Sequence, residues 1–122
     1  MKITNFEIYN ITNAYNQAFG DFKSYIPAKV NFYIQKNISV LAAAASAVEE
    51  ARLGIAKHYG TPDENGSAYQ IPENQLPQAT KELNELFSIE QELDIKTFSI
   101  EELGTVEFTP AQMQTIMFMI ED

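Results

Sequence analysis

Hydrophobic or small residues recur at steps of three and four along the stretch from Pro27 to Tyr59. This spacing is typical of one amphipathic helix whose apolar stripe packs as in a coiled coil. Pro27 suits the first helical turn, where its missing N–H costs nothing, and Gly60 suits a left-handed stop after the last turn. Only Arg52 interrupts the stripe. Its members are Val30, Ile34, Ile38, Leu41, Ala45, Val48, Ile55 and Tyr59.

The predicted helix is long for a chain of this size. About 33 residues at ~1.5 Å each give a rod of roughly 50 Å. A compact chain of 122 residues measures only about 35 Å across. We therefore expect the helix to bend, to protrude or to be covered by a partner, either a second copy of the chain or a target protein. In the competing account, the third and last helices cover the stripe within one chain.

Shorter helices are predicted before and after the long one. A capping box formed by Thr4 and Glu7 starts the first helix, which ends at about Phe19. Its apolar face comprises Ile8, Ile11, Tyr15 and Phe19. The following connector is expected to dock Phe22 and Tyr25 on the core. Another helix spans about 74–89, and its inward residues are Leu76, Ala79, Leu83, Leu86 and Phe87.

The last helix is predicted to begin with Thr109 as its cap and Pro110 at its first position. The residues of its apolar stripe are Met113, Ile116, Met117 and Ile120. Core packing is the favoured role of Met113 and Met117. Met119 lies off the stripe, and methionine is common on adaptable binding faces. Met119 is therefore a candidate contact residue.

Strands are predicted in two short segments. Residues 92–98 alternate between apolar and polar side chains, and residues 105–108 are β-prone, so we expect a small antiparallel β-hairpin beside the long helix. Between them, Ser99 and Glu102 form a second capping box, and one helical turn ends at Gly104. The Asn65-Gly66 pair predicts a tight turn, which makes a second small hairpin plausible there. The predicted class is mainly α (α+β), a single domain over residues 1–122 with one long central helix and three shorter ones.

Composition limits the function classes. Seventeen acidic residues against eight basic ones give a net charge of −9, which disfavours direct nucleic-acid binding and anionic membranes and favours a basic protein partner. The chain has no cysteine, which excludes disulfides, thiolate catalysis and cysteine-ligated zinc. No segment reads as a signal peptide or a membrane span, so we expect a protein that is not secreted.

Candidate catalytic and metal-binding residues are few. His58 is the only histidine, which leaves a triad or a histidine metal site without a second member. The turn Asp63-Glu-Asn-Gly66 resembles part of a calcium loop, but Thr61 and Pro72 stand where the first and twelfth ligands belong. The carboxylate pairs are expected to be solvated surface; they are Glu49-Glu50, Glu101-Glu102 and Glu121-Asp122. We therefore expect no enzyme activity and no cofactor.

Three segments of the chain resemble a family of small phage and prophage proteins of Gram-positive bacteria, a domain of unknown function. They are Ile26-Pro-Ala-Lys-Val-Asn-Phe-Tyr-Ile-Gln-Lys-Asn37, Lys57-His-Tyr-Gly60, and Phe108-Thr-Pro-Ala-Gln-Met113 followed by Met119-Ile-Glu-Asp122. The resemblance implies a phage origin and residence in the cytoplasm of the bacterial host or in the virion. It transfers no catalytic residue. Ala42 to Ala47 departs from the family, whose members are more charged there.

Three functions are compatible with these patterns. The first is a small acidic, non-catalytic binding protein that engages a bacterial host protein, for example as an inhibitor of a host defence system. The second is a virion structural or assembly factor, in which the partner is a phage protein. The third, least favoured, is an enzyme that uses carboxylates alone. The predicted contact residues, which also fit a homo-oligomer, are Ile38, Leu41, Ala45, Val48, Glu49, Arg52 and Met119.

Overall fold

The computed structural model describes residues 1–66 and 68–121. Its helices are α1 (Asn5–Phe19), α2 (Ala28–Tyr59), α3 (Leu76–Ser88) and α4 (Pro110–Ile116), with the 3₁₀ turns η1 (Glu73–Gln75), η2 (Ile100–Leu103) and η3 (Met117–Met119). Its strands are β1 (Lys2–Thr4), β2 (Thr61–Pro62), β3 (Tyr69–Gln70), β4 (Glu90–Glu92), β5 (Phe98–Ser99) and β6 (Ile120–Glu121). The predicted mainly α class, with one long helix and small antiparallel pairing, is confirmed.

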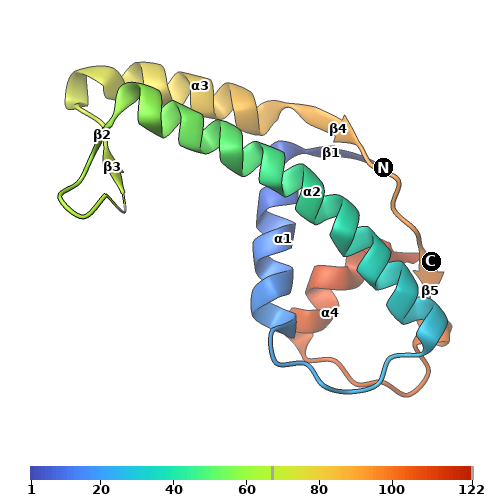
Figure 1. The fold of residues 1–122 in the computed structure, drawn as a ribbon. Helices are drawn as coiled ribbons and strands as arrows, with labels where there is room; N and C mark the ends of the chain where they lie inside the picture. The colour runs from blue at the N-terminus through green and yellow to red at the C-terminus, as the bar shows by residue number, and fades with distance from the viewer. Residues whose placement is uncertain (67, 122) are drawn as a thin grey trace.

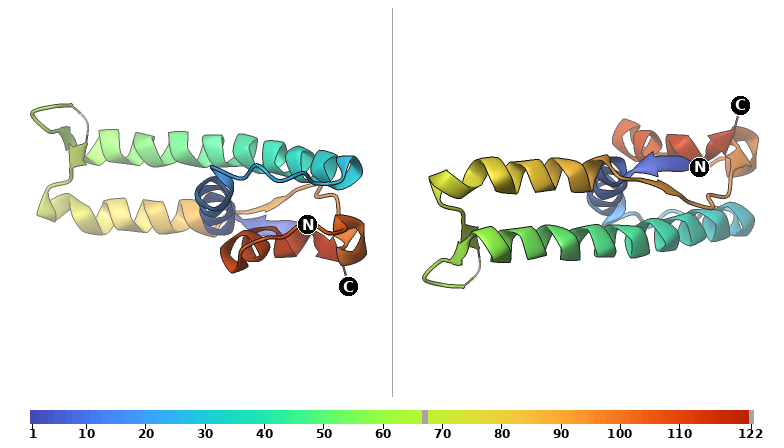
Figure 2. Two further views of the ribbon diagram at one scale, coloured as in Figure 1. Left: turned by 90° about the horizontal axis from the view of Figure 1, so that it is seen from below. Right: turned by 90° about the horizontal axis from the view of Figure 1, so that it is seen from above.

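The long helix α2 does protrude, but another helix accompanies it. Its first half lies in what we call the base, residues 1–45 and 89–121, together with α1 and α4 (Figure 1). Its second half runs antiparallel to α3 in what we call the arm, residues 46–66 and 68–88 (Figure 2). The β2–β3 hairpin closes the far end of the arm, as the Asn65-Gly66 turn predicted.

Two clusters of buried side chains hold the base together, and α2 contributes to both. The first cluster comprises Val30, Ile34, Phe98, Leu103, Ile116 and Met119. The second comprises Ile3, Ile8 and Leu41. The hydrophobic stripe of α2 is thus covered within the chain along the base, by α1, α4 and the C-terminal segment, because these elements cross its inner face. Among the described residues of the arm, only Val48 and Ala79 are buried hydrophobic residues.

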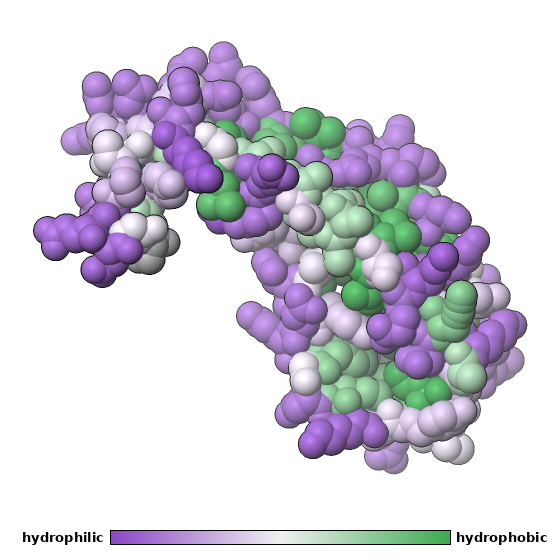
Figure 3. All heavy atoms as spheres, viewed as in Figure 1, coloured by the Kyte–Doolittle hydropathy of each residue, from purple (hydrophilic) through white to green (hydrophobic). Residues whose placement is uncertain are grey.

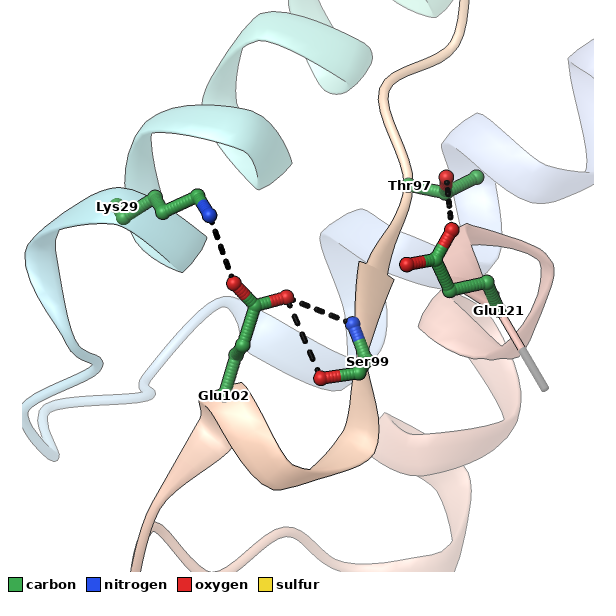
Figure 4. Close-up of polar contacts among 5 residues, drawn as sticks. All are labelled: Lys29, Thr97, Ser99, Glu102 and Glu121. Carbon is green, nitrogen blue, oxygen red and sulfur yellow. Dashed lines mark hydrogen bonds and ion pairs between the residues drawn. The ribbon is translucent and has the colours of Figure 1, made fainter.

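The two predicted capping boxes form, at Thr4 and Ser99, and the predicted cap Thr109 forms a third with Gln112. In the capping box at Ser99, the Glu102 carboxylate also contacts Lys29 in the first turn of α2 (Figure 4). Glu102 accepts hydrogen bonds from the Ser99 backbone N–H at 2.8 Å and from the Lys29 ammonium at 2.8 Å. Thr97 donates to Glu121 at 3.0 Å beside the parallel β5–β6 pair. The Lys29–Glu102 contact joins the beginning of α2 to the C-terminal part of the chain, and the Thr97–Glu121 contact joins two segments of that part.

The hairpin predicted between residues 92–98 and 105–108 is wrong. Within residues 92–98, only the two end residues, Glu92 and Phe98, lie in strands. Residues 105–108 form no strand. β4 pairs instead with β1, antiparallel with Lys2 opposite Glu92. Alternation identified an extended segment correctly, since Leu93 and Ile95 pack against the second cluster. Alternation carries no information about the hydrogen-bonding partner, which lies some ninety residues away in sequence.

Asn37 takes the place of a strand partner for the segment after β4. Its side chain is fully buried, and its amide nitrogen donates to the Lys96 carbonyl at 2.8 Å. Its amide oxygen accepts from the Lys96 N–H at 2.7 Å. A buried peptide group without a partner is costly, so this pair of bonds is what lets an unpaired extended segment pack on α2.

The predicted faces of two helices need correction. Met119, expected off the stripe, is fully buried, whereas Met117 is 58 % exposed. The reason is that α4 ends at Ile116 and the chain continues as a 3₁₀ turn and then as β6, so the helical period no longer applies. Leu76, expected to face inward, is exposed because it opens α3 at the far end of the arm.

Gly60 follows α2, but not in the predicted left-handed conformation. Its φ and ψ are −113° and 172°, which is extended backbone. A Cβ at this position would lie 2.7 Å from the Ala56 carbonyl and 3.0 Å from the Gln70 carbonyl. Glycine is therefore required because the carbonyls of Ala56 at the end of α2 and of Gln70 in β3 both lie close to this position. Across the described residues, no helix combines the length and apolar character needed to cross a membrane.

Candidate protein-interaction surfaces

One hollow lies in the base, between the end of α1, the connector 20–27 and the start of α2. It has a volume of about 520 Å³. Ring packing shapes its floor: Tyr15 and Phe19 stack with their centroids 4.6 Å apart, and Phe19 meets Phe22 edge-on at 5.3 Å. Phe22 in turn stacks on Phe108 at 5.5 Å. We call this hollow the aromatic groove. Its other lining residues are Lys23, Ser24, Tyr25, Ile26, Ala28, Asn31 and Gln35.

Tyr25 at the edge of the aromatic groove is the most exposed large hydrophobic residue of the described chain, at 78 %. The prediction that Tyr25 docks on the core is therefore wrong, although Phe22 does pack there. The connector is anchored by Phe22 and by half-buried Ile26 on either side, which leaves Tyr25 pointing away from the core. Exposed tyrosines are characteristic of protein interfaces, because a rigid ring contributes much contact area at little entropic cost.

Polar groups in the aromatic groove complement its rings. Burial raises the pKa of the Tyr15 hydroxyl, and a hydrogen bond with the Gln35 side chain partly opposes this rise. The hydroxyl is therefore neutral at physiological pH. Asn31 and Ser24 add further donors and acceptors, and Lys23 adds one positive charge. Such a lining suits apolar side chains of a polypeptide together with its backbone amides.

A second hollow, of about 330 Å³, lies at the corner where α1 meets α2. Its lining residues are Tyr9, Thr12, Asn13, Ala45, Ser46 and Glu49. Two of the predicted contact residues, Ala45 and Glu49, line this hollow. A third, Arg52, lies next to it and donates two hydrogen bonds to Glu49, at 2.9 and 2.5 Å. That hydrogen bonding lowers the pKa of Glu49 and raises that of Arg52. Both side chains stay charged and keep more than a third of their surface exposed.

The other predicted contact residues lie elsewhere. Leu41, Val48 and Met119 have at most 2 % of their surface exposed. Their assignment as intermolecular contacts needs correction, since in this fold the chain itself covers them. Ile38 is half-buried between the two clusters of the base. A sequence pattern marks such residues as apolar and periodic, but it does not distinguish a partner in the same chain from one in another chain.

The two features that the sequence offers as metal-binding candidates are the turn at Asp63 and the side chain of His58. The Asp63 side chain accepts from the Asn65 N–H at 3.1 Å, and the Asp63 carbonyl accepts from Gly66, which makes a hairpin turn of this segment. His58 is exposed and meets Tyr59 edge-on at 4.6 Å. Within residues 1–66 and 68–121, no three His, Cys, Asp or Glu side chains gather closely enough to hold a metal ion.

The surface of the arm differs from that of the base. The far end of the arm is mainly hydrophilic, whereas hydrophobic residues reach the surface in the base and along α2 (Figure 3). Comparisons of the chain with protein-family models, curated proteins and solved structures found no match. The function therefore has to be argued from these surfaces.

Proposed function

We propose that this protein is a small acidic, non-catalytic binding protein that engages a bacterial host protein in the host cytoplasm. The aromatic groove is its partner site. The observation that carries the proposal is the placement of Tyr25, an aromatic residue that is 78 % exposed at the edge of a hollow of about 520 Å³. Buried aromatic anchors surrounded by hydrogen-bonding groups dominate the energetics of protein interfaces.

The charge of the chain supports a basic partner. A net charge of −9 raises the rate at which a positively charged protein meets this surface. The resemblance to small phage proteins of Gram-positive bacteria supports the choice of a host protein. Inhibition of a host defence protein is the form of engagement that we favour, because binding alone is sufficient to block such a target.

Tyr25→Ala tests the aromatic groove. Tagged wild-type and variant proteins are expressed in a Gram-positive host, and co-purified proteins are quantified by mass spectrometry. The partner should co-purify with the wild type and be lost at least tenfold with Tyr25→Ala, since removal of an interface anchor costs about 2 kcal/mol or more. Met117→Ala is the matched control, because Met117 is also exposed but does not line the groove.

Two results would contradict the proposal. One is a partner that binds wild type and Tyr25→Ala equally. The other is the absence of any host protein that is enriched with both the wild type and Met117→Ala. Circular dichroism of each variant confirms that the fold is retained, which we expect because both side chains are largely exposed.

The arm favours a second candidate function, a virion structural or assembly factor. Its α2–α3 pair extends beyond the base and buries few hydrophobic residues, as expected of an element that is completed by neighbours in an assembly. The same co-purification from phage-infected cells separates the two functions. Head or tail proteins bound through residues 46–88 would support assembly, and a host protein bound through the groove would support the first function.

A further inference from the structure

The outer face of α2 is uncovered along its whole length. Figure 2 shows α2 along one side of the molecule, where the β2–β3 hairpin projects past it at the far end of the arm. At 3.6 residues per turn, nine exposed residues lie within about 40° of the direction in which Ala43 points. They form what we call the outer face. They are Lys29, Phe32, Lys36, Ser39, Ala43, Ala47, Glu50, Gly54 and Lys57. The buried residues of α2 lie on the opposite side.

Gly54 has no explanation within the chain. It lies inside a helix and is exposed, where glycine is less favourable than alanine. A Cβ on Gly54 would meet no atom within 4 Å, so no neighbouring element requires the missing side chain. A glycine at an exposed position inside a helix is explained if another chain packs so closely against it that a Cβ would be in the way.

Phe32 is the complementary feature on the same face. Its ring is 53 % exposed, and it lies eleven residues before Ala43, whereas Gly54 lies eleven residues after it. In an antiparallel pair of α2 helices centred on Ala43, each Phe32 therefore meets the Gly54 of the other copy. Small residues at the centre allow the two axes to approach to about 8 Å. Figure 3 shows this centre as a pale green band along α2.

Charge follows the same symmetry. Lys36 lies seven residues before Ala43 and Glu50 lies seven residues after it, so the antiparallel arrangement places each Lys36 opposite a Glu50. Among the described residues neither side chain has an ionic partner in its own chain. At the ends, Lys29 would face Lys57, but Lys29 is already held by Glu102 at 2.8 Å.

From these features we propose that the outer face of α2 binds a second copy of this chain, antiparallel and two-fold symmetric about Ala43. A two-fold axis makes every contact occur twice, so the dimer contains two Phe32–Gly54 contacts and two Lys36–Glu50 pairs. One helix face is a small interface, so the dissociation constant is expected on the order of 10–100 μM. None of the residues that line the aromatic groove belongs to the outer face. A variant that abolishes dimerisation is therefore expected to leave partner binding intact, and the reverse.

Charge reversal on the full chain tests the register. Sedimentation velocity at about 0.15 M salt, where the net charges are screened beyond ~8 Å, measures the dissociation constant. Lys36→Glu or Glu50→Lys alone sets like charges opposite one another and should weaken the dimer at least about tenfold. The double variant restores opposite charges and should return the constant to within about threefold of the wild type. Glu85→Lys on α3, with the same change of net charge as Glu50→Lys, is the control for that variant.

A larger side chain at Gly54 tests the proposed contact between Gly54 and the Phe32 of the other copy. Gly54→Leu should abolish the dimer while preserving or raising the helical content, because leucine is the better helix former. Ala42→Leu, on the same helix but about 100° away from Ala43, should leave the dimer intact. A protein that is monomeric up to about 1 mM would overturn the proposal. So would a dimer that is unaffected by Gly54→Leu, or one weakened by the single charge reversals and not restored by the double variant.

Discussion

The base and the arm of this protein are built from the same long helix, but different forces stabilise them. In the base, α2 crosses α1, α4 and the C-terminal segment, and two clusters of buried side chains fill the space between them. In the arm, beyond the corner with α1, α2 packs against α3 alone among the described helices, and Val48 and Ala79 are the only buried hydrophobic residues among those described. A helix with one neighbour can bury only one narrow stripe of its surface.

The arm compensates partly with polar contacts between neighbouring side chains. Arg52 binds Glu49 on α2, and the Tyr59 hydroxyl donates to Glu82 across to α3. Hydrogen bonding to Glu82 raises the pKa of Tyr59. Exposed contacts of this kind contribute little to stability. The comparison therefore indicates that the base sets the stability of the molecule and that the arm opens more easily.

The largest effect is expected from the centre of the base. Phe98 is 1 % exposed in the first cluster, and Phe98→Ala should lower the free energy of unfolding by about 3–5 kcal/mol. Urea denaturation followed by circular dichroism measures the change. An effect below about 1 kcal/mol would mean that the base is not tightly packed and that the contrast with the arm is false.

Asn37→Leu is expected to have the next largest effect. It removes both hydrogen bonds to Lys96 and leaves a backbone N–H and a carbonyl without a partner, at a cost of about 1–3 kcal/mol. Asn10→Leu, at an exposed position of α1, is the control and should be close to neutral. Equal losses in the two variants would contradict the role of Asn37 in place of a strand partner.

A matched pair of deletions compares the two regions directly. Val30 in the base and Val48 in the arm are 1 % and 2 % exposed, and both lie on α2. Removal of two methyl groups costs about 1–2 kcal/mol from transfer alone. The cost should be larger for Val30→Ala, because the crowded base cannot collapse around the cavity whereas α3 can shift toward α2. A larger loss for Val48→Ala would reverse the comparison.

The smallest effects are expected from exposed carboxylates, one in each region. Hydrogen bonds from Lys29 and Ser99 lower the pKa of Glu102, and one from Arg52 lowers that of Glu49. A lowered folded-state pKa stabilises the protein above the ordinary carboxyl value of 4.5, and this stability is lost as the pH falls through the folded-state pKa. Glu102→Gln and Glu49→Gln should each destabilise the protein at pH 7 and not at pH 3. Thermal unfolding at both pH values measures this, and a difference that persists at pH 3 would rule out ionisation as its cause.

Much of the local structure could be predicted from short-range patterns. The span of α2, the capping boxes at Thr4 and Ser99 and the cap at Thr109 depend on residues within one or two helical turns of one another, so the sequence is sufficient to predict them. The turn at Asn65-Gly66 is local for the same reason. The excess of helix, and hence the fold class, follows from these local preferences.

The candidate sites were less accessible to sequence analysis. Of the predicted contact residues, Ala45 and Glu49 line a hollow and Arg52 is bound to Glu49, but the neighbouring Tyr9 comes from α1. The aromatic groove was missed because its walls come from α1, α2 and a connector without regular structure. A signal was present in the aromatic residues Tyr15, Phe19, Phe22 and Tyr25, which follow one another at steps of three or four. Those steps continue past the end of α1, where they no longer describe one helical face.

The amino-acid sequence alone determined the spans of α1 and α2, where α4 begins, which segments are extended and which residues are apolar. The tertiary structure decided which partner each of them contacts. β4 pairs with β1, Lys96 is bound by the Asn37 side chain, and Leu41, Val48 and Met119 are buried within the chain itself. It also decided which face of α2 remains free. The physical reason is that caps and periodicity act between residues a few positions apart, whereas burial depends on which distant segments pack together.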